Sequence, residues 1–246
     1  MSTLGLIITA SLFVSLISFV GALGLIRTKG SSARHGTTLV AFAAGVMLAS
    51  AVLALLPEAL EEAGSSIAFP LFWGIVLFFF LERFLLWIHH HHEPHGVKPT
   101  APLILVGDGM HNFIDGVAIA AAFLTSPLLG ATTTLAIAAH EIPQEIADLS
   151  LLIYSGMKKR IALALNFVSG LTAMVGAIGG YFYLEHLREN LPLILAFTVG
   201  MFLYIACSDL IPEMHKDFAK QKRWQQTLPF IVGVCIMWII TLFLHE

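Results

Sequence analysis

The chain has 246 residues, of which 57% are hydrophobic and only 12% charged, and its formal net charge is −3. An ordinary soluble domain carries about 25% charged residues, so this composition argues against a soluble enzyme and indicates a membrane protein. The slightly acidic balance, without a block of basic residues, also argues against nucleic acid as a partner.

Apolar segments follow one another along the whole chain, each close to the roughly 20 residues that a helix needs to cross the hydrocarbon core. They are Leu4–Ile26, Thr37–Leu56, Ala68–Ile88, Ala101–Leu124, Ala131–Tyr154, Ile161–Leu184, Leu191–Ile211 and Leu228–Leu244. Continuous apolar runs that contain Gly and Pro are typical of membrane-spanning helices, whereas barrel strands alternate polar and apolar residues. The sequence therefore predicts an all-α, polytopic membrane protein with eight transmembrane helices in a single domain over residues 1–246.

The basic residues predict the orientation of these spans. Nearly all of them fall at the loops after the first, third, fifth and seventh segments, and Arg188 is the one exception. The residues at these loops are Arg27, Lys29, Arg34, Arg83, Lys98, Lys158, Lys159, Arg160, Lys216, Lys220, Lys222 and Arg223. Because Lys and Arg are enriched in cytoplasmic loops, we predict a multi-pass protein of the cell membrane with both termini extracytoplasmic.

The predicted cytoplasmic loop over residues 89–100 contains a histidine tract. Its histidines are His89, His90, His91, His92 and His95. A tract of this kind binds Zn²⁺ and similar ions, but a solvated loop whose histidines hold metal only loosely has the same composition. Both interpretations stay open at this stage.

Two polar motifs interrupt the fourth and fifth apolar segments. One runs from His111 to Asp115 and the other from His140 to Glu145. Residues four apart share a helix face, which places His111 over Asp115 and His140 over Gln144. The loop between the segments is short, so the helices should be antiparallel neighbours whose motifs meet near the membrane midplane, where transporter sites lie. Imidazoles, carboxylates and amides in this arrangement form a metal-ligand set.

The acidic residues of these motifs need compensation inside a membrane. Asp115, Glu141 and Glu145 together would cost on the order of 10 kcal/mol if they were ionised and unpaired at that depth. Neither segment contains Lys or Arg, so protons, water or a bound cation must compensate, and a divalent metal accounts for acids and histidines together. Asp108 lies one turn from His111 and Asp148 one turn from Glu145, in both cases toward the predicted cytoplasmic side. We predict that these two aspartates form an exit step for the ion.

At these residues the sequence resembles the ZIP (Zrt/Irt-like protein) family of divalent-metal transporters. The stretches Leu55–Ala59 (Leu-Leu-Pro-Glu-Ala) and Asp209–Glu213 (Asp-Leu-Ile-Pro-Glu) also match, and the resemblance covers essentially the whole chain. It implies transport of Zn²⁺, or alternatively Fe²⁺, Mn²⁺ or Cd²⁺, into the cytoplasm through a binuclear site. The metal is then the substrate, no organic cofactor is expected, and the partners are the metal ion, the lipid bilayer and a second copy of the chain in a homodimer.

The resemblance also implies individual metal ligands. They are His111, Asn112 and Asp115 in the fourth span, His140, Glu141 and Gln144 in the fifth, and Met47 as an additional position in the second. Many relatives have His where Gln144 stands, and some bacterial members have Glu where Asn166 stands. Because Gln is a weak neutral ligand while His binds Zn²⁺ well, these departures leave the choice of metal open. With Asp108, Glu145 and Asp148, these residues form the predicted metal site.

Two other functional classes fit parts of the pattern. An intramembrane metalloenzyme of the HExxH type needs a second histidine at position 144, where the chain has glutamine, so we do not expect an enzyme. A metal sensor without ion flux would need an output domain, and the sequence shows no soluble domain. Transmembrane flux of metal distinguishes the transporter from both alternatives.

Overall fold

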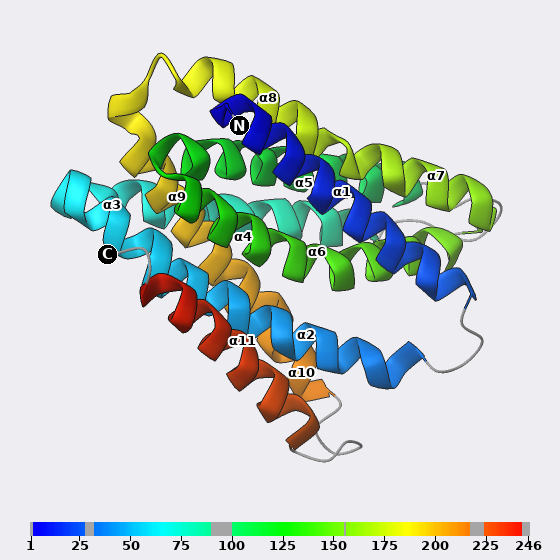
Figure 1. Cartoon of the computed structure of the whole chain (residues 1–246). Coiled ribbons are helices and arrows are strands. Elements are labelled where there is room, and N and C mark those ends of the chain that lie inside the picture. The colour runs from blue at the N-terminus through cyan, green and yellow to red at the C-terminus, as the bar shows by residue number, and fades with distance from the viewer. Residues whose placement is uncertain (1, 28–31, 90–99, 155, 217–223, 243–246) are drawn as a thin grey trace.

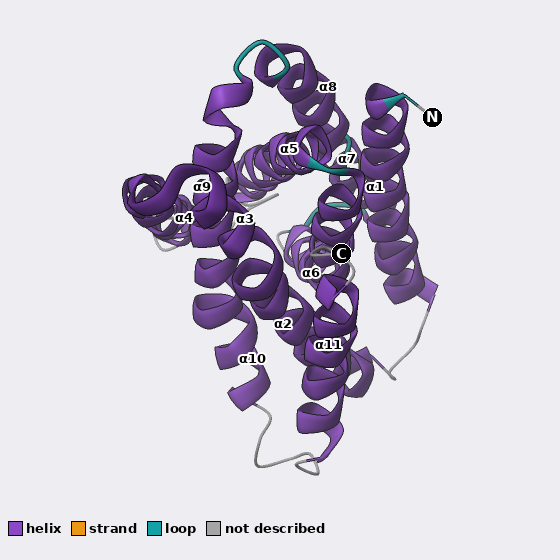
Figure 2. Cartoon of the chain, turned by 60° about the vertical axis from the view of Figure 1, so that its left-hand side comes forward, coloured by secondary structure: helices purple, strands orange, loops and turns teal. Residues whose placement is uncertain are grey.

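A computed structural model describes residues 2–27, 32–89, 100–154, 156–216 and 224–242. Within these ranges the chain is helical almost throughout and contains no strand (Figure 2), which confirms the all-α prediction. The predicted histidine tract lies outside the described residues, except for His89 at the end of a helix.

The helices follow the predicted apolar segments closely. The first half of the chain forms α1 (Thr3–Arg27), α2 (Ser32–Ala49), η1 (Ser50–Leu55), α3 (Leu56–Ala63), η2 (Gly64–Ile67), α4 (Ala68–His89) and α5 (Thr100–Thr125). The second half forms α6 (Pro127–Tyr154), α7 (Lys159–Gly170), α8 (Thr172–Leu184), η3 (Arg188–Asn190), α9 (Leu191–Tyr204), η4 (Ile205–Leu210), α10 (Ile211–Lys216) and α11 (Trp224–Leu242). In the view of Figure 1 most of the long helices run from upper left to lower right.

Several described stretches are long and apolar enough to cross a membrane. They are Thr3–Gly21, Val40–Arg83, Lys159–Leu184 and Arg188–Leu210, and Gln226–Leu242 is a shorter apolar helix. The helices α5 and α6 are also long, but they carry the polar motifs. The count of eight spans stays a prediction.

The helices form two groups that share one long contact. The site bundle consists of α1, α5, α6, α7 and α8, which pack on one another. The framework bundle consists of α2, η1, α3, α4, α9, η4, α10 and α11. Figure 2 shows α6 in the middle of the molecule, where it contacts α1 and α5 on one side and α2 and η1 on the other. The contact between the bundles therefore runs along α5 and α6.

Reciprocal glycines allow the closest helix contacts. On α5 a Cβ at Gly116 would overlap the carbonyl oxygen of Ala173, and on α8 a Cβ at Gly176 would overlap that of Phe113. A Cβ at Gly179, on another face of α8, would meet nothing. Further reciprocal pairs join α4 to α9 and α2 to α11: Gly74 with Gly200, and Gly45 with Gly233. Small residues at such contacts are typical of helix packing in membranes.

Two wide helical turns, η1 and η4, come directly before prolines. Pro57 follows η1 and Pro212 follows η4. Proline lacks an N–H and its ring clashes with the carbonyl four residues earlier, so a wider turn accommodates it without ending the helix. Both turns lie inside the framework bundle, and η1 also packs against α6 of the site bundle.

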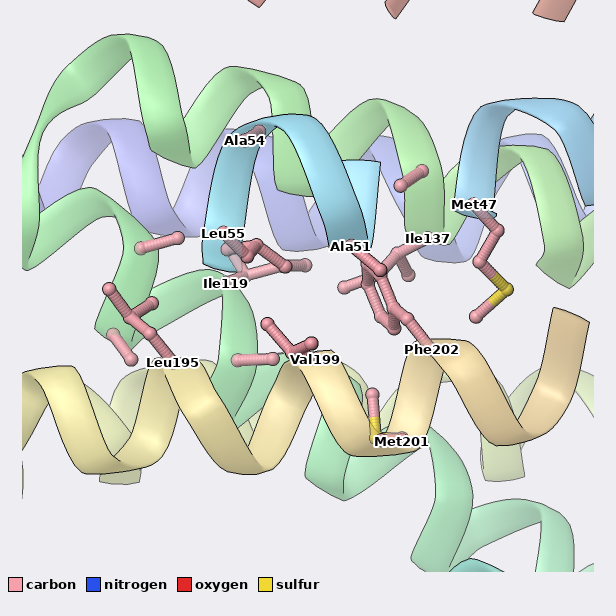
Figure 3. Close-up of a cluster of buried hydrophobic side chains, with 14 of the residues drawn as sticks. Met47, Ala51, Ala54, Leu55, Ile119, Ile137, Leu195, Val199, Met201 and Phe202 are labelled. Atoms are coloured by element: carbon pink, nitrogen blue, oxygen red, sulfur yellow. The ribbon is translucent and has the colours of Figure 1, made fainter. Parts of the chain in front are cut away.

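The apolar core fills the contact between the bundles. Figure 3 shows Met47 and Ala51 of the second segment, Ile137 of α6, and Val199 and Phe202 of α9 in one cluster. All of these side chains are buried. The core lies directly beside the polar motifs of α5 and α6, because the ring of Phe202 contacts that of His140 with centroids 6.2 Å apart.

Candidate metal site

The helices α5 and α6 bring the two predicted motifs together. Only Ser126 separates the helices, and Pro127 begins α6, where its fixed backbone angle suits a first helical position. The connection is therefore shorter than the sequence suggests, and α5 and α6 pack as antiparallel neighbours. Both motifs lie near the middle of their helices, so they face each other.

Four side chains of these motifs converge on one point; we call them the tetrad. They are His111, Asp115, His140 and Glu141, all buried, with ligand atoms within 4.8 Å of one another. The two Nε2 atoms of the histidines are 3.3 Å apart. The Nε2 of His140 lies 3.2 Å from Asp115 Oδ2 and 3.5 Å from Glu141 Oε1. The Nε2 of His111 lies 3.7 and 3.6 Å from the same two oxygens.

These separations match the edges of a tetrahedral zinc site. With metal–ligand bonds of about 2.0–2.2 Å, neighbouring ligand atoms in a tetrahedron lie about 3.3–3.6 Å apart. Five of the six separations between the tetrad atoms span 3.2 to 3.7 Å, and the sixth, between Asp115 and Glu141, lies within 4.8 Å. Two imidazole nitrogens and two carboxylate oxygens are also a donor set that suits zinc and neighbouring divalent metals. The tetrad is therefore already spaced to hold one cation of that size.

The tautomer of His140 also fits a metal ligand. Its Nδ1 lies 3.1 Å from the carbonyl oxygen of Ala136, one turn earlier in α6. A carbonyl oxygen can only accept, so Nδ1 carries the proton and donates it. In the neutral ring the free lone pair is then on Nε2, the atom that lies nearest the other tetrad groups. Metal-ligating histidines usually make this second bond, which fixes the ring.

The two carboxylates of the tetrad lack hydrogen-bond donors. Both side chains of Asp115 and Glu141 are 0% exposed, and none of their oxygens has a hydrogen-bond partner within the described ranges. Their described ion pairs are with the two histidines, and neither α5 nor α6 contains Lys or Arg. Buried carboxylates without donors are costly, and a cation at the centre of the tetrad would remove that cost.

Two aromatic rings of the framework bundle contact the histidines of the tetrad. Phe78 of α4 contacts the ring of His111 with centroids 5.4 Å apart and an interplanar angle of 70°. Phe202 of α9 contacts the ring of His140. The tetrad belongs entirely to the site bundle, whereas the two rings that cover it belong to the framework bundle.

A second set of polar residues lies one turn along the same helices; we call it the lower cluster. Its members are Asp108 and Asn112 of α5, Glu145 of α6, and Asn166 and Ser169 of α7. The amide nitrogen of Asn112 donates to Asp108 Oδ1 over 2.9 Å, and the hydroxyl of Ser169 donates to Asp108 Oδ2. The amide nitrogen of Asn166 donates to Glu145 Oε2. All five side chains are buried.

The remaining predicted ligands lie apart from the tetrad or at its margin. Gln144 and Asp148 of α6 are only partly buried. Met47 is fully buried in the apolar core of Figure 3. Of the ten predicted residues, the structure thus gathers four in the tetrad and three in the lower cluster, and their roles as ligands stay predictions.

Sequence reasoning missed the side chains that surround these groups. Ser169 was not predicted, although it lies three residues after Asn166 and so on the same face of its helix. Phe78 and Phe202 carry no signal that separates them from other phenylalanines of apolar helices. The spacing to Asn166 would have identified Ser169, but only tertiary structure identifies the two rings.

The chain is similar to a family of zinc transporters and to several of its individual proteins. The family model described as "ZIP Zinc transporter" matches residues 2–102 and 88–241. The chain is 37% identical over 159 residues to human zinc transporter ZIP6, covering 61% of the chain and 21% of that protein. It is 37% identical over 155 residues to zinc transporter ZIP10 of Danio rerio, covering 60% of the chain and 18% of that protein.

A further relative has the same degree of similarity. Human zinc transporter ZIP4 is 37% identical over 161 residues, covering 62% of the chain and 24% of that protein. The chain thus spans about a fifth of the length of the curated relatives it matches.

Proposed function

Because the chain belongs to the ZIP zinc transporter family, we propose that it carries divalent metal ions, zinc foremost, across a membrane into the cytoplasm. The protein is a multi-pass membrane protein, as its family and its apolar helices require. Iron, manganese and cadmium are the other substrates we propose. The metal is cargo here, so the site must bind it firmly enough to strip water and weakly enough to release it.

The observation that carries the proposal is the tetrad. Four buried ligand groups stand at the spacing of a zinc site, and their carboxylate oxygens lack hydrogen-bond donors among the described residues. A purely structural polar cluster would satisfy its own acceptors, as the lower cluster largely does. We propose that the lower cluster, with Asp148 and Gln144, forms the next step of the ion toward the cytoplasm.

The proposed direction follows from the loops. The exposed residues Lys158, Lys159 and Arg160 precede and begin α7, at the end of the bundle opposite the α5–α6 connection. Since basic loops are cytoplasmic, the α5–α6 connection lies outside the cell, as do both termini. Eight spans in a single transmembrane domain complete this topology, with the metal site near the midplane.

The partners are part of the same proposal. Lipid covers the exposed apolar side chains of α1, α4 and α11, and the homodimer that the resemblance implies stays a prediction. The histidine tract after α4 would face the cytoplasm and meet the ion after its passage. We expect no enzyme activity, because Gln144 stands where a metalloprotease helix needs its second histidine.

Uptake of radioactive zinc by proteoliposomes tests the function. The wild-type chain should accumulate zinc, and the double variant His111→Ala, His140→Ala should fall to the level of empty liposomes, because it removes both nitrogen ligands of the tetrad. The control is His186→Ala, since His186 is exposed and bonds only to its own helix at the Phe182 carbonyl. Equal uptake by wild type and double variant would overturn the proposal.

A further inference from the structure

Two buried hydroxyl groups have no hydrogen bond in the part of the chain that the structure describes. Ser50 begins η1 and Thr133 lies in α6; both side chains are 0% exposed, and Ser50 Oγ and Thr133 Oγ1 have no partner within the described ranges. A hydroxyl removed from water without a hydrogen bond is unfavourable, so each of these groups requires an explanation.

Adjacent residues show that a hydroxyl at this point of α6 can bond to a carbonyl of its own helix. Thr132 donates to the carbonyl of Leu129 over 2.8 Å, and Thr134 donates to that of Gly130 over 2.7 Å. Thr133 stands between them and makes no such bond. Other buried hydroxyls bond to carbonyls of their own helices in the same way: Ser11, Ser15, Ser18 and Thr198. The hydroxyls of Ser50 and Thr133 thus differ from these in making no bond to their own helices.

Both residues belong to helix faces that lead to the tetrad. On α6, Thr133, Ile137 and Glu141 follow one another at intervals of four, so they share a face, and Thr133 lies about 12 Å before Glu141 at 1.5 Å per residue. On the facing segment, Ser50 follows Met47 by three residues. Since η1 packs against α6, the two hydroxyls flank the same seam between the framework bundle and the site bundle.

The seam between these hydroxyls and the tetrad is closed by apolar side chains. Figure 3 shows Ile137 beside Ala51, with Met47 and Phe202 next to them, and all four are buried. An ion that reaches the tetrad along this seam must pass this layer. Thr133 comes one turn before Ile137, on the side of the α5–α6 connection, which is the outer side in the proposed topology. Ser50 lies between Met47 and Ala51, at the level of the layer itself.

We propose that Ser50 and Thr133 form a polar step at this layer and just outside it, where the water shell of an entering divalent cation donates hydrogen bonds to the two hydroxyl oxygens. This inference rests on the proposed transport function. A hydroxyl oxygen accepts a hydrogen bond from a metal-bound water, and it is a weak enough partner not to trap the ion. The step explains why two hydroxyls stay unbonded when the seam is closed.

The test compares three adjacent threonines in zinc uptake by proteoliposomes. Thr133→Val and Ser50→Ala should each lower kcat/KM for uptake, and the double variant should lose about tenfold, the size of one lost hydrogen-bonding step. Thr132→Val and Thr134→Val are the matched controls, because their hydroxyls serve only their own helix, and they should transport like wild type. Thr133→Ser, which restores the hydroxyl, should restore uptake.

Zinc affinity measured on the detergent-solubilised protein separates this role from others. It should stay within about twofold of wild type in Thr133→Val, since one lost hydrogen bond outside the tetrad leaves its ligands intact. Thermal unfolding of the variant should not begin at a lower temperature, because no existing bond is removed. Uptake by Thr133→Val equal to that of the two controls would overturn the inference, and so would an equilibrium affinity that falls in parallel with uptake.

The outcomes also separate this inference from the proposed function. If the wild type accumulates zinc and the double histidine variant does not, transport stands whatever Thr133 does. If the wild type accumulates no zinc, both proposals fail.

Discussion

The tetrad and the lower cluster both take their carboxylates from α5 and α6, but these carboxylates differ in their hydrogen bonds. In the tetrad, Asp115 and Glu141 accept no hydrogen bond from a described residue. One turn away, both oxygens of Asp108 accept hydrogen bonds, from Asn112 and Ser169. Glu145 is intermediate, because Oε2 accepts from Asn166 while Oε1 has no partner among the described residues.

This difference suggests two roles: carboxylates without donors can bind a cation, and carboxylates with donors can hold helices together. A buried carboxylate that already holds two donors stabilises the helices that supply them, here α5 and α7, and has less to gain from a cation. A buried carboxylate without donors destabilises the empty protein and gains most when a cation arrives. We therefore propose that the tetrad holds the ion most firmly, whereas the lower cluster holds α5, α6 and α7 together and offers the ion only a weaker next step.

The largest expected effect comes from removing one open carboxylate. Asp115→Asn keeps the shape of the side chain and removes its charge, so zinc uptake should fall to background. Zinc at about 100 times its Kd should stabilise the wild type by ~2.7 kcal/mol, and the variant should lose most of that gain. Thermal unfolding in detergent, with zinc and with a chelator, measures both states.

The control for Asp115→Asn is Glu189→Gln, which removes a carboxylate from the exposed turn η3. It should leave both uptake and the zinc-dependent stabilisation unchanged. A second result is expected for the metal-free protein. With chelator present, Asp115→Asn should unfold at a temperature no lower than that of wild type. A large loss of metal-free stability would show that Asp115 supports the fold as Asp108 does.

A smaller effect, of the opposite kind, is expected in the lower cluster. Ser169→Ala removes one of the two donors to Asp108 and should lower the free energy of unfolding by about 1–3 kcal/mol, since a buried acceptor loses its partner. The number of zinc ions bound should not change. Ser18→Ala is the control, because that buried hydroxyl donates only to the Val14 carbonyl of its own helix, and it should cost less.

The number of zinc ions bound by Ser169→Ala shows whether the lower cluster also binds metal. If Ser169→Ala lowers the number of bound ions by one with little loss of stability, Asp108 is a metal ligand, as the sequence predicts. The lower cluster would then be a second ion site rather than a support.

The sequence predicted the fold and the tetrad for a clear reason. Apolar runs of about 20 residues identify membrane helices almost by length alone. Within such runs His111, Asp115, His140 and Glu141 stand out, because ionisable groups in apolar helices are rare and functional. The interval of four and the short loop expected over Thr125–Gly130 then predict that the two motifs face each other, and the structure brings four of their side chains together.

The parts that escaped prediction depend on contacts between distant segments. Ser169 meets Asp108 across 61 positions of the chain, and no local pattern states that pairing. The wide turns at η1 and η4 follow from prolines in helices that packing keeps continuous, so they too need the neighbouring helices. Gln144 and Met47 were predicted as ligands, and those roles stay predictions: Gln144 is partly buried, and Met47 is buried in the apolar core.

Met47 gives the smallest expected effect and tests whether the tetrad needs a ligand from the framework bundle. Met47→Leu conserves volume and should cost less than about 1.5 kcal/mol of stability. Because the Met47 side chain packs in the apolar core, we expect zinc uptake to stay within about twofold of wild type. A twofold change is less than the loss of one hydrogen bond.

Competition by cadmium gives the Met47 experiment its sharper measurement. Thioether sulfur prefers soft metals, so a ligating Met47 would favour Cd²⁺ over Zn²⁺, and Met47→Leu would weaken cadmium inhibition of zinc uptake. Met201→Leu is the matched control, since Met201 is equally buried in the core but lies on α9. If cadmium inhibits both variants and wild type alike, the tetrad holds the ion with ligands of the site bundle alone. A loss of cadmium inhibition in Met47→Leu only would instead mean that the ion bridges both bundles, so that any movement of one bundle against the other must break a metal–sulfur contact.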